Sequence, residues 1–163
     1  MEIRPAVPGD ADAIEGIRVR GWQAAYRHVF PAVELDAMPV DGSRWRTRIE
    51  TPPTGWSTFV ADDRGVVGFA CVGPSRDERG LGELYAIYVD PGSWGAGAGR
   101  ALIARAEERL RERYEVATLW VLADNPRARR FYEAAGWAPD GARKAEERWG
   151  VRAAEVRYRK ELA

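Results

Sequence analysis

The sequence predicts a single α/β domain, residues 1–163, built around a mixed β-sheet. The length of 163 residues suits one domain with a sizeable core. Helical and strand patterns alternate in the order β, two or three α, three β, α, β, α, two β, which is typical of an α/β fold. No linker, repeat or low-complexity segment divides the chain.

The N-terminal half is expected to hold a strand, a group of helices and a hairpin. A short strand covers 2–7 and ends at Pro8-Gly9, and helical segments follow at about 10–26, 32–38 and 43–50. Alternating apolar residues predict strands at 56–62 and 66–72. Asp63-Arg64-Gly65 between them is typical of a hairpin turn.

The C-terminal half alternates strands and helices. A polar loop at 74–82 precedes a strand at 83–89, and a helix is expected at about 98–113. The segment 115–122 is almost continuously apolar, which indicates a strand buried on both faces. Asn125-Pro126 should open a helix that ends at Gly136, as N-cap and first helical residue. Weaker strand patterns cover 137–149 and 151–162.

The composition excludes several classes of function. Lys plus Arg and Asp plus Glu number 25 each, so no net charge attracts nucleic acid or an anionic membrane. A single cysteine, Cys71, excludes an internal disulfide, and a single histidine, His28, leaves no cluster for a metal or a Ser/His/Asp triad. Without a signal-peptide pattern or a membrane-spanning apolar run, a cytoplasmic protein is expected, and a homodimer stays open.

One stretch, 84–103, organises the chain. Its apolar run stops at Asp90-Pro91-Gly92, glycines follow at 95, 97 and 99, and an amphipathic helix then begins. A strand, a glycine loop and a helix N-terminus in this order form an anion site, because free N–H groups and the helix dipole point at the loop. The stretch predicts a site for a phosphorylated cofactor.

The spacing of the glycines bears on which cofactor binds. A P-loop is excluded, because Ala98 rather than a lysine follows Gly97. A dinucleotide fingerprint counted from Gly95 places Arg100 where a third glycine belongs, and its acidic ribose partner, Glu115, precedes its strand. A nucleotide-binding oxidoreductase is therefore a poor but open alternative.

The stretch resembles the cofactor loop of the GNAT acetyltransferase superfamily, Gln/Arg-x-x-Gly-x-Gly/Ala after a strand ending in Val-x-Pro. Here the residues are Trp94-Gly-Ala-Gly-Ala-Gly99 after Val89-Asp-Pro91, with Trp94 in place of Gln or Arg. The segment 125–137 resembles the family's Asn-x-x-Ala-x-x-Phe-Tyr-x-x-x-Gly-Phe, with Trp137 in place of the last Phe. The two motifs cover 83–137, and the element order extends the likeness over nearly the whole chain.

The resemblance implies a mostly antiparallel sheet of about seven strands with helices on both faces, and acetyl-CoA as cosubstrate without a metal. The backbone of Ile87 and Val89 would pair with the pantetheine arm, and the Val89 N–H would polarise the thioester carbonyl. The N–H groups of the loop would hold the pyrophosphate. The cofactor-binding residues implied are Ile87, Tyr88, Val89, Trp94, Gly95, Ala96, Gly97, Ala98, Gly99, Arg100, Asn125, Ala128 and Phe131.

The implied reaction moves an acetyl group directly from acetyl-CoA to a primary amine in a ternary complex. An amine with a pKa near 10.4 is mostly charged at neutral pH, so a carboxylate or a water chain is needed to deprotonate it. Glu83 matches the general base of the family's histone-acetylating branch, and strand alternation places it on one face with Tyr85 and Ile87. Tyr132 matches the tyrosine that protonates the departing thiolate.

The acceptor is not given by the sequence. Trp22, Tyr26 and Tyr85 are weak candidates for an aromatic pocket that would hold a cationic amine. A polyamine-like molecule, an antibiotic, an amino acid and a protein N-terminus all stay open, as does the use of another acyl group. A catalytically silent CoA-binding sensor or interaction domain is the main alternative to an enzyme.

Overall fold

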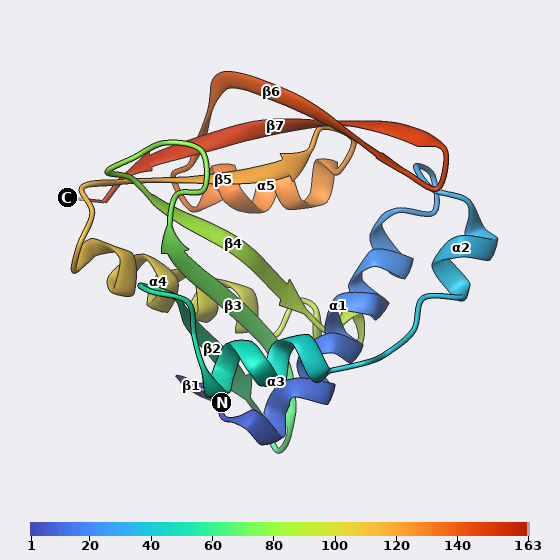
Figure 1. The fold of residues 1–163 in the computed structure, drawn as a ribbon, viewed down its shortest axis with the longest axis horizontal. Helices are drawn as coiled ribbons and strands as arrows, with labels where there is room; N and C mark the ends of the chain where they lie inside the picture. Colours follow the sequence, from blue (N-terminus) through green and yellow to red (C-terminus); the bar gives the residue numbers. More distant parts are fainter. Residues whose placement is uncertain (163) are drawn as a thin grey trace.

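The computed structural model describes residues 1–162 as one seven-stranded sheet flanked by helices (Figure 1). The strand order is β1-β2-β3-β4-β5-β7-β6, and every neighbouring pair is antiparallel except β4 with β5. The strands are β1 (Glu2–Pro5), β2 (Ser57–Asp62), β3 (Val66–Pro74), β4 (Gly82–Val89), β5 (Val116–Leu122), β6 (Ala138–Arg148) and β7 (Val151–Glu161). The α-helices are α1 (Ala11–Ala25), α2 (Ala32–Asp36), α3 (Ser43–Glu50), α4 (Ala98–Arg111) and α5 (Pro126–Ala134).

This order confirms the predicted fold class and every predicted element, with small changes at the ends. β1 ends at Pro5, two residues before the expected end, while β3 continues to Pro74 and takes up the start of the expected loop. Gly65 donates its N–H to the Asp62 carboxylate at 3.0 Å, which closes the predicted hairpin. Two 3-10 turns, Pro8–Asp10 and Pro91–Ser93, were not expected from the sequence.

The sheet buries a different set of helices on each face. Helices α4 and α5 cover one face, where Leu102 and Leu110 pack against apolar residues of β2 to β5 and β7. Helices α1 and α3 cover the other face, where Ile14 and Trp45 pack against Phe69 of β3. Alternation along β2 and β3 supplies both layers, so period-2 patterning sets the two cores.

The sheet opens between its two middle strands. The pairing of β4 with β5 covers only Gly82 with Ala117 and Glu83 with Thr118. Beyond these residues the two halves of the sheet diverge, with α1 near the open end (Figure 1). A third apolar cluster, made from the end of α1, α2, Leu122 of β5 and Ala153 of β7, lies at this end. The gap leaves one edge of β4 without a neighbouring strand.

A β-bulge in β4 corrects one expectation from the sequence. The register of β3 against β4 shifts between Cys71 and Val72, so Tyr85 is the extra residue. Tyr85 and Ala86 therefore both pack on the α1 face, while Leu84 and Ile87 pack on the α4 face. The prediction that Ile87 shares a face with Tyr85 was wrong, because the bulge reverses the alternation.

None of the helices described for residues 1–162 is long and apolar enough to cross a bilayer.

Candidate functional site

The free edge of β4 forms one wall of the candidate site. The Asp90 N–H donates to the Val67 carbonyl of β3 at 2.7 Å. Because bonded residues alternate in an antiparallel ladder, Tyr88 also faces β3, whereas the backbone groups of Ile87 and Val89 face the gap. These groups are free to pair with an extended ligand, as a missing strand would.

The glycine loop ends this wall with a cradle of N–H groups. Gly95 and Gly97 have φ angles of 84° and 91°, a left-handed conformation that favours glycine. A Cβ atom added at either position would meet nothing within 4 Å, so the loop surface is open. Among the described residues, the N–H groups of Gly95, Ala96 and Gly97 donate to no protein acceptor. Since Gly97 is the N-cap of the 14-residue α4, this cradle suits an anion.

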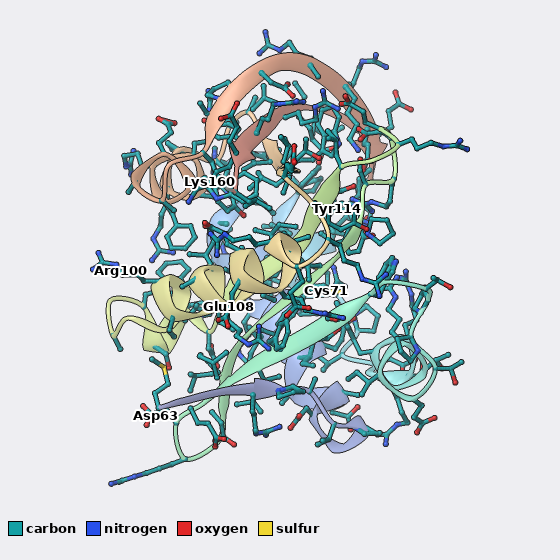
Figure 2. The ribbon with its side chains drawn as sticks, turned by 90° about the vertical axis from the view of Figure 1, so that its left-hand side faces the viewer. Asp63, Cys71, Arg100, Glu108, Tyr114 and Lys160 are labelled. Carbon is teal, nitrogen blue, oxygen red and sulfur yellow. The ribbon has the colours of Figure 1, made fainter. Side chains whose placement is uncertain are left out.

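The first residues of α4 differ in exposure, one side chain facing the core and another facing solvent. Ala98 is buried, and Arg100 is exposed and projects away from the helix (Figure 2). Its guanidinium group can therefore reach a ligand phosphate without losing a protein partner.

Trp94, the departure from the expected loop motif, holds the loop against β4. Its indole N–H donates to the Val89 carbonyl at 2.9 Å. The guanidinium carbon of Arg127, from the first turn of α5, lies 3.3 Å from the centre of the Trp94 ring. Trp94 thus links the end of β4, the loop and α5 in place of a Gln or Arg side chain.

Helix α5 lies beside the loop. The Asn125 side chain accepts the Ala128 N–H at 3.2 Å, which confirms the predicted N-cap. The same side chain donates to the Tyr26 hydroxyl at 3.3 Å. A Cβ atom added at Gly99 would lie 3.2 Å from the Phe131 ring, so a larger residue here would displace Phe131 by a few tenths of an ångström.

Tyr132 points from α5 into the interior beside the gap. Only 8% of its surface is exposed, and its hydroxyl makes no hydrogen bond within residues 1–162. Burial, with a smaller contribution from nearby Tyr88, raises the pKa of Tyr132. The phenol therefore keeps its proton at neutral pH and can donate it.

Glu83 lies where the two halves of the sheet separate. Its carboxylate is 1% exposed and is held by one residue of the β3–β4 loop, Arg76. The Arg76 backbone N–H donates to Oε1 at 2.9 Å, and the Arg76 guanidinium donates to Oε2 at 2.6 Å. Both oxygens are therefore occupied, a state that the sequence did not indicate.

The expected acceptor residues separate into two places. Trp22 and Tyr26 form an aromatic cluster with Phe30 and Trp149, with ring centres 4.9–6.4 Å apart. An open groove of about 450 Å³ between α1, the α2–α3 segment and the β6–β7 turn borders this cluster at Trp149. Tyr85 lies elsewhere, donating its hydroxyl proton to the Pro74 carbonyl.

Sequence reasoning overlooked three residues of this region, Arg76, Arg127 and Glu155. Arg76 and Arg127 stand in arginine-rich polar segments, where most side chains are solvated, so no signal separated them from their neighbours. Glu155 lies among alternating charges on β7, and its inward direction depends on pairing with β5.

The arrangement can hold an extended, phosphate-ended molecule along β4, with a proton donor beside it. The open edge would pair with an amide-bearing arm, and the loop at its end would bind the phosphates. No group of three His, Cys, Asp or Glu side chains in residues 1–162 is placed to hold a metal ion.

Comparison with known sequences identifies related proteins. The model of the "Acetyltransferase (GNAT) family" matches residues 19–137. The chain is 35% identical, over 96% of its length and 90% of the relative's, to the "Uncharacterized N-acetyltransferase YuaI" of Bacillus subtilis. It is 48% identical, over 77% of its length, to a mycothiol acetyltransferase of Beutenbergia cavernae, of which it spans 46%.

Comparison with solved structures agrees on the fold. The ribosomal-protein-alanine N-acetyltransferase of Brucella melitensis superposes with a TM-score of 0.80 at 24% identity, over 99% of both chains. The protein yncA of Salmonella typhimurium, solved with its cofactor acetyl-CoA, superposes with a TM-score of 0.78 at 22% identity, over 100% of this chain and 94% of that one.

Proposed function

Because this chain belongs to the GNAT acetyltransferase family and is an acyltransferase, we propose that it transfers the acetyl group of acetyl-CoA to a primary amine. The transfer is direct, within a ternary complex of enzyme, acetyl-CoA and amine.

One observation carries the proposal: the free edge of β4 leads, through the short turn Pro91–Ser93, into the glycine loop. The edge offers the backbone groups of Ile87 and Val89, and the loop offers N–H groups that donate to no protein acceptor. A pantetheine arm carries amides at β-strand spacing and ends in a pyrophosphate, so both parts of the site match one ligand.

The residues then take the following roles. The N–H groups of 95–100 hold the pyrophosphate, with Arg100 adding a charge-assisted contact. The Val89 N–H polarises the thioester carbonyl of acetyl-CoA, which makes the acetyl carbon more open to attack by the amine. Tyr132 donates a proton to the leaving sulfur, and burial keeps its phenol protonated until then. The family motif implies Glu83 as the base, and Arg76 donates to both oxygens of its carboxylate.

The proposal is tested by thermal unfolding with acetyl-CoA and, separately, with NAD. Acetyl-CoA should raise the melting temperature and NAD should leave it unchanged, because the loop lacks the third glycine of a dinucleotide site. No shift with millimolar acetyl-CoA would contradict the proposed cosubstrate. Thiol release with a panel of amines separates the enzyme from a silent CoA-binding domain, which would bind acetyl-CoA without releasing thiol.

A further inference from the structure

Glu155 of β7 lies beside the end of β5, after that strand has left β4. It pairs with Leu122 of β5 and with Lys144 of β6, so these three side chains share one face of the sheet. Ala153, two residues earlier and on the same face, packs in the aromatic cluster with Tyr26. The Glu155 carboxylate therefore lies on the α1 side of the sheet, at the open end of the gap.

Glu155 is one of four polar side chains that converge there from different elements. Burial raises the pKa of Tyr26, the residue that follows α1, and nearby Tyr88, Tyr132 and Glu155 raise it further. Burial likewise raises the pKa of Tyr88 of β4, and the charge of Glu155 adds to this effect. The carboxylate thus lies within electrostatic range of the phenols of Tyr26 and Tyr88, and Tyr88 in turn raises the pKa of Tyr132.

Within residues 1–162, the Glu155 carboxylate accepts no hydrogen bond, and its one ion pair is a long contact with Lys144. Its side chain is 18% exposed, and Oε2 is buried without a hydrogen bond. The nearest cation, the Lys144 ammonium, lies 3.9 Å from Oε2, beyond hydrogen-bond distance, and stacks over the Trp120 ring instead. A buried carboxylate without hydrogen bonds destabilises the fold, and a bound cation would remove that cost.

Glu83, by contrast, has no oxygen without a hydrogen bond. Arg76 already donates to both of its oxygens, so an ammonium group would have to compete with this ion pair for Glu83. Glu155 has an oxygen without a hydrogen bond on the face of the sheet that carries the aromatic cluster, where the Arg148 guanidinium already lies 4.7 Å from the centre of the Trp22 ring.

We propose that Glu155 binds the ammonium group of the acceptor amine and accepts its proton, an inference that rests on the acetyl transfer proposed above. One N–H bond of the ammonium breaks, and its proton moves to the Glu155 carboxylate. The freed nitrogen lone pair attacks the thioester carbonyl carbon, the C–S bond breaks, and the thiolate leaves with a proton from Tyr132. The second proton of the attacking nitrogen returns to Tyr132, and Glu155 releases its proton to solvent.

The proton affinity of Glu155 reflects groups on all the elements that face it. Burial raises its pKa, and Lys144 opposes this effect. The other groups near it are Glu146 of β6, Arg76 of the β3–β4 loop, Tyr26 after α1 and Tyr88 of β4. As the acceptor must meet an ionised carboxylate, kcat/KM for the amine should rise with pH as Glu155 loses its proton.

The experiment compares the wild type with Glu155→Gln in thiol release with spermidine, kanamycin, L-lysine and an alanyl peptide. The variant keeps the shape but not the charge, so its KM for the amine should rise at least tenfold and its kcat fall by about 10²–10⁴. Its affinity for acetyl-CoA should stay within twofold, and the acidic limb of its kcat/KM profile should disappear. Glu155→Asp, which keeps a carboxylate, should recover part of kcat.

The matched control is Glu146→Gln, which removes an exposed carboxylate lying 3.9 Å from the same lysine, Lys144. Above the acidic limb of the pH profile it should leave both kcat and KM unchanged, and the limb itself should move only slightly to lower pH, because the charge of Glu146 helps to raise the pKa of Glu155. If Glu155→Gln transfers acetyl groups within twofold of wild type, Glu155 has no role and acetyl transfer stands. If wild type binds acetyl-CoA but acetylates no amine, both proposals are refuted. Should Glu155→Gln fail to fold, a pH profile of Glu155→Asp identical to wild type would overturn the inference.

Discussion

The substitution Gly97→Val tests the phosphate cradle most directly. Gly97 has a φ angle of 91° and open space around it, so a valine side chain would fit but would occupy the concave surface of the loop. A non-glycine residue in this conformation costs about 1–3 kcal/mol of stability. For a domain of this size each kcal/mol lowers the melting temperature by about 2–4 °C. The variant should therefore fold, with a melting temperature lowered by roughly 2–12 °C.

The effect on binding is larger than the effect on folding. At a ligand concentration 100 times the dissociation constant, acetyl-CoA should stabilise the wild type by about 2.7 kcal/mol. This corresponds to a rise of roughly 5–11 °C in melting temperature. In Gly97→Val the rise should vanish, because the added methyl groups keep phosphate away from the N–H groups.

Gly141→Val is the matched control, since Gly141 in β6 has the same φ of 91° and equally open surroundings. It should lose similar stability yet keep the full response to acetyl-CoA. Thermal scans of the three proteins with and without acetyl-CoA provide the assay. If Gly97→Val responds as strongly as Gly141→Val, the pyrophosphate does not bind at this loop.

Three further predictions concern single side chains. Tyr132→Phe should lower kcat at least tenfold with little change in acetyl-CoA affinity. The fold should tolerate the change, because the hydroxyl makes no hydrogen bond within residues 1–162. Steady-state kinetics with an accepted amine check this, and a kcat within twofold of wild type would make Tyr132 a packing residue. Arg76→Met should destabilise the fold by about 2–3 kcal/mol in denaturant unfolding, less than for a fully buried pair because the Arg76 side chain is 56% exposed; adding Glu83→Gln should recover most of the loss. Glu155→Gln should be more stable than wild type at pH 7 and equally stable below pH 4.5, the ordinary pKa of a glutamate, because a carboxyl group whose pKa is raised by folding destabilises the folded state once the pH exceeds that value. Unfolding at both pH values checks the sign, and a variant that is less stable than wild type at pH 7 would contradict it.

The sequence determined those parts of the protein that depend on local patterning. Period-2 and period-3.6 patterns placed every strand and helix, because each element buries one face or stripe. Asn125-Pro126 and the glycines at 95 and 97 specified a helix start and an open loop, because N-cap and left-handed conformations depend on the residue itself.

Only the tertiary structure decided what depends on register and on distant partners. The bulge at Tyr85 adds one residue to one strand, and no local pattern marked it, yet it turned Ile87 to the other face. Glu83 and Glu155 are both glutamates on strands in the sequence. In the fold, Arg76 donates hydrogen bonds to both oxygens of Glu83, whereas Oε2 of Glu155 is buried without a hydrogen bond. The difference arises because Arg76 of the β3–β4 loop bonds to Glu83 and not to Glu155.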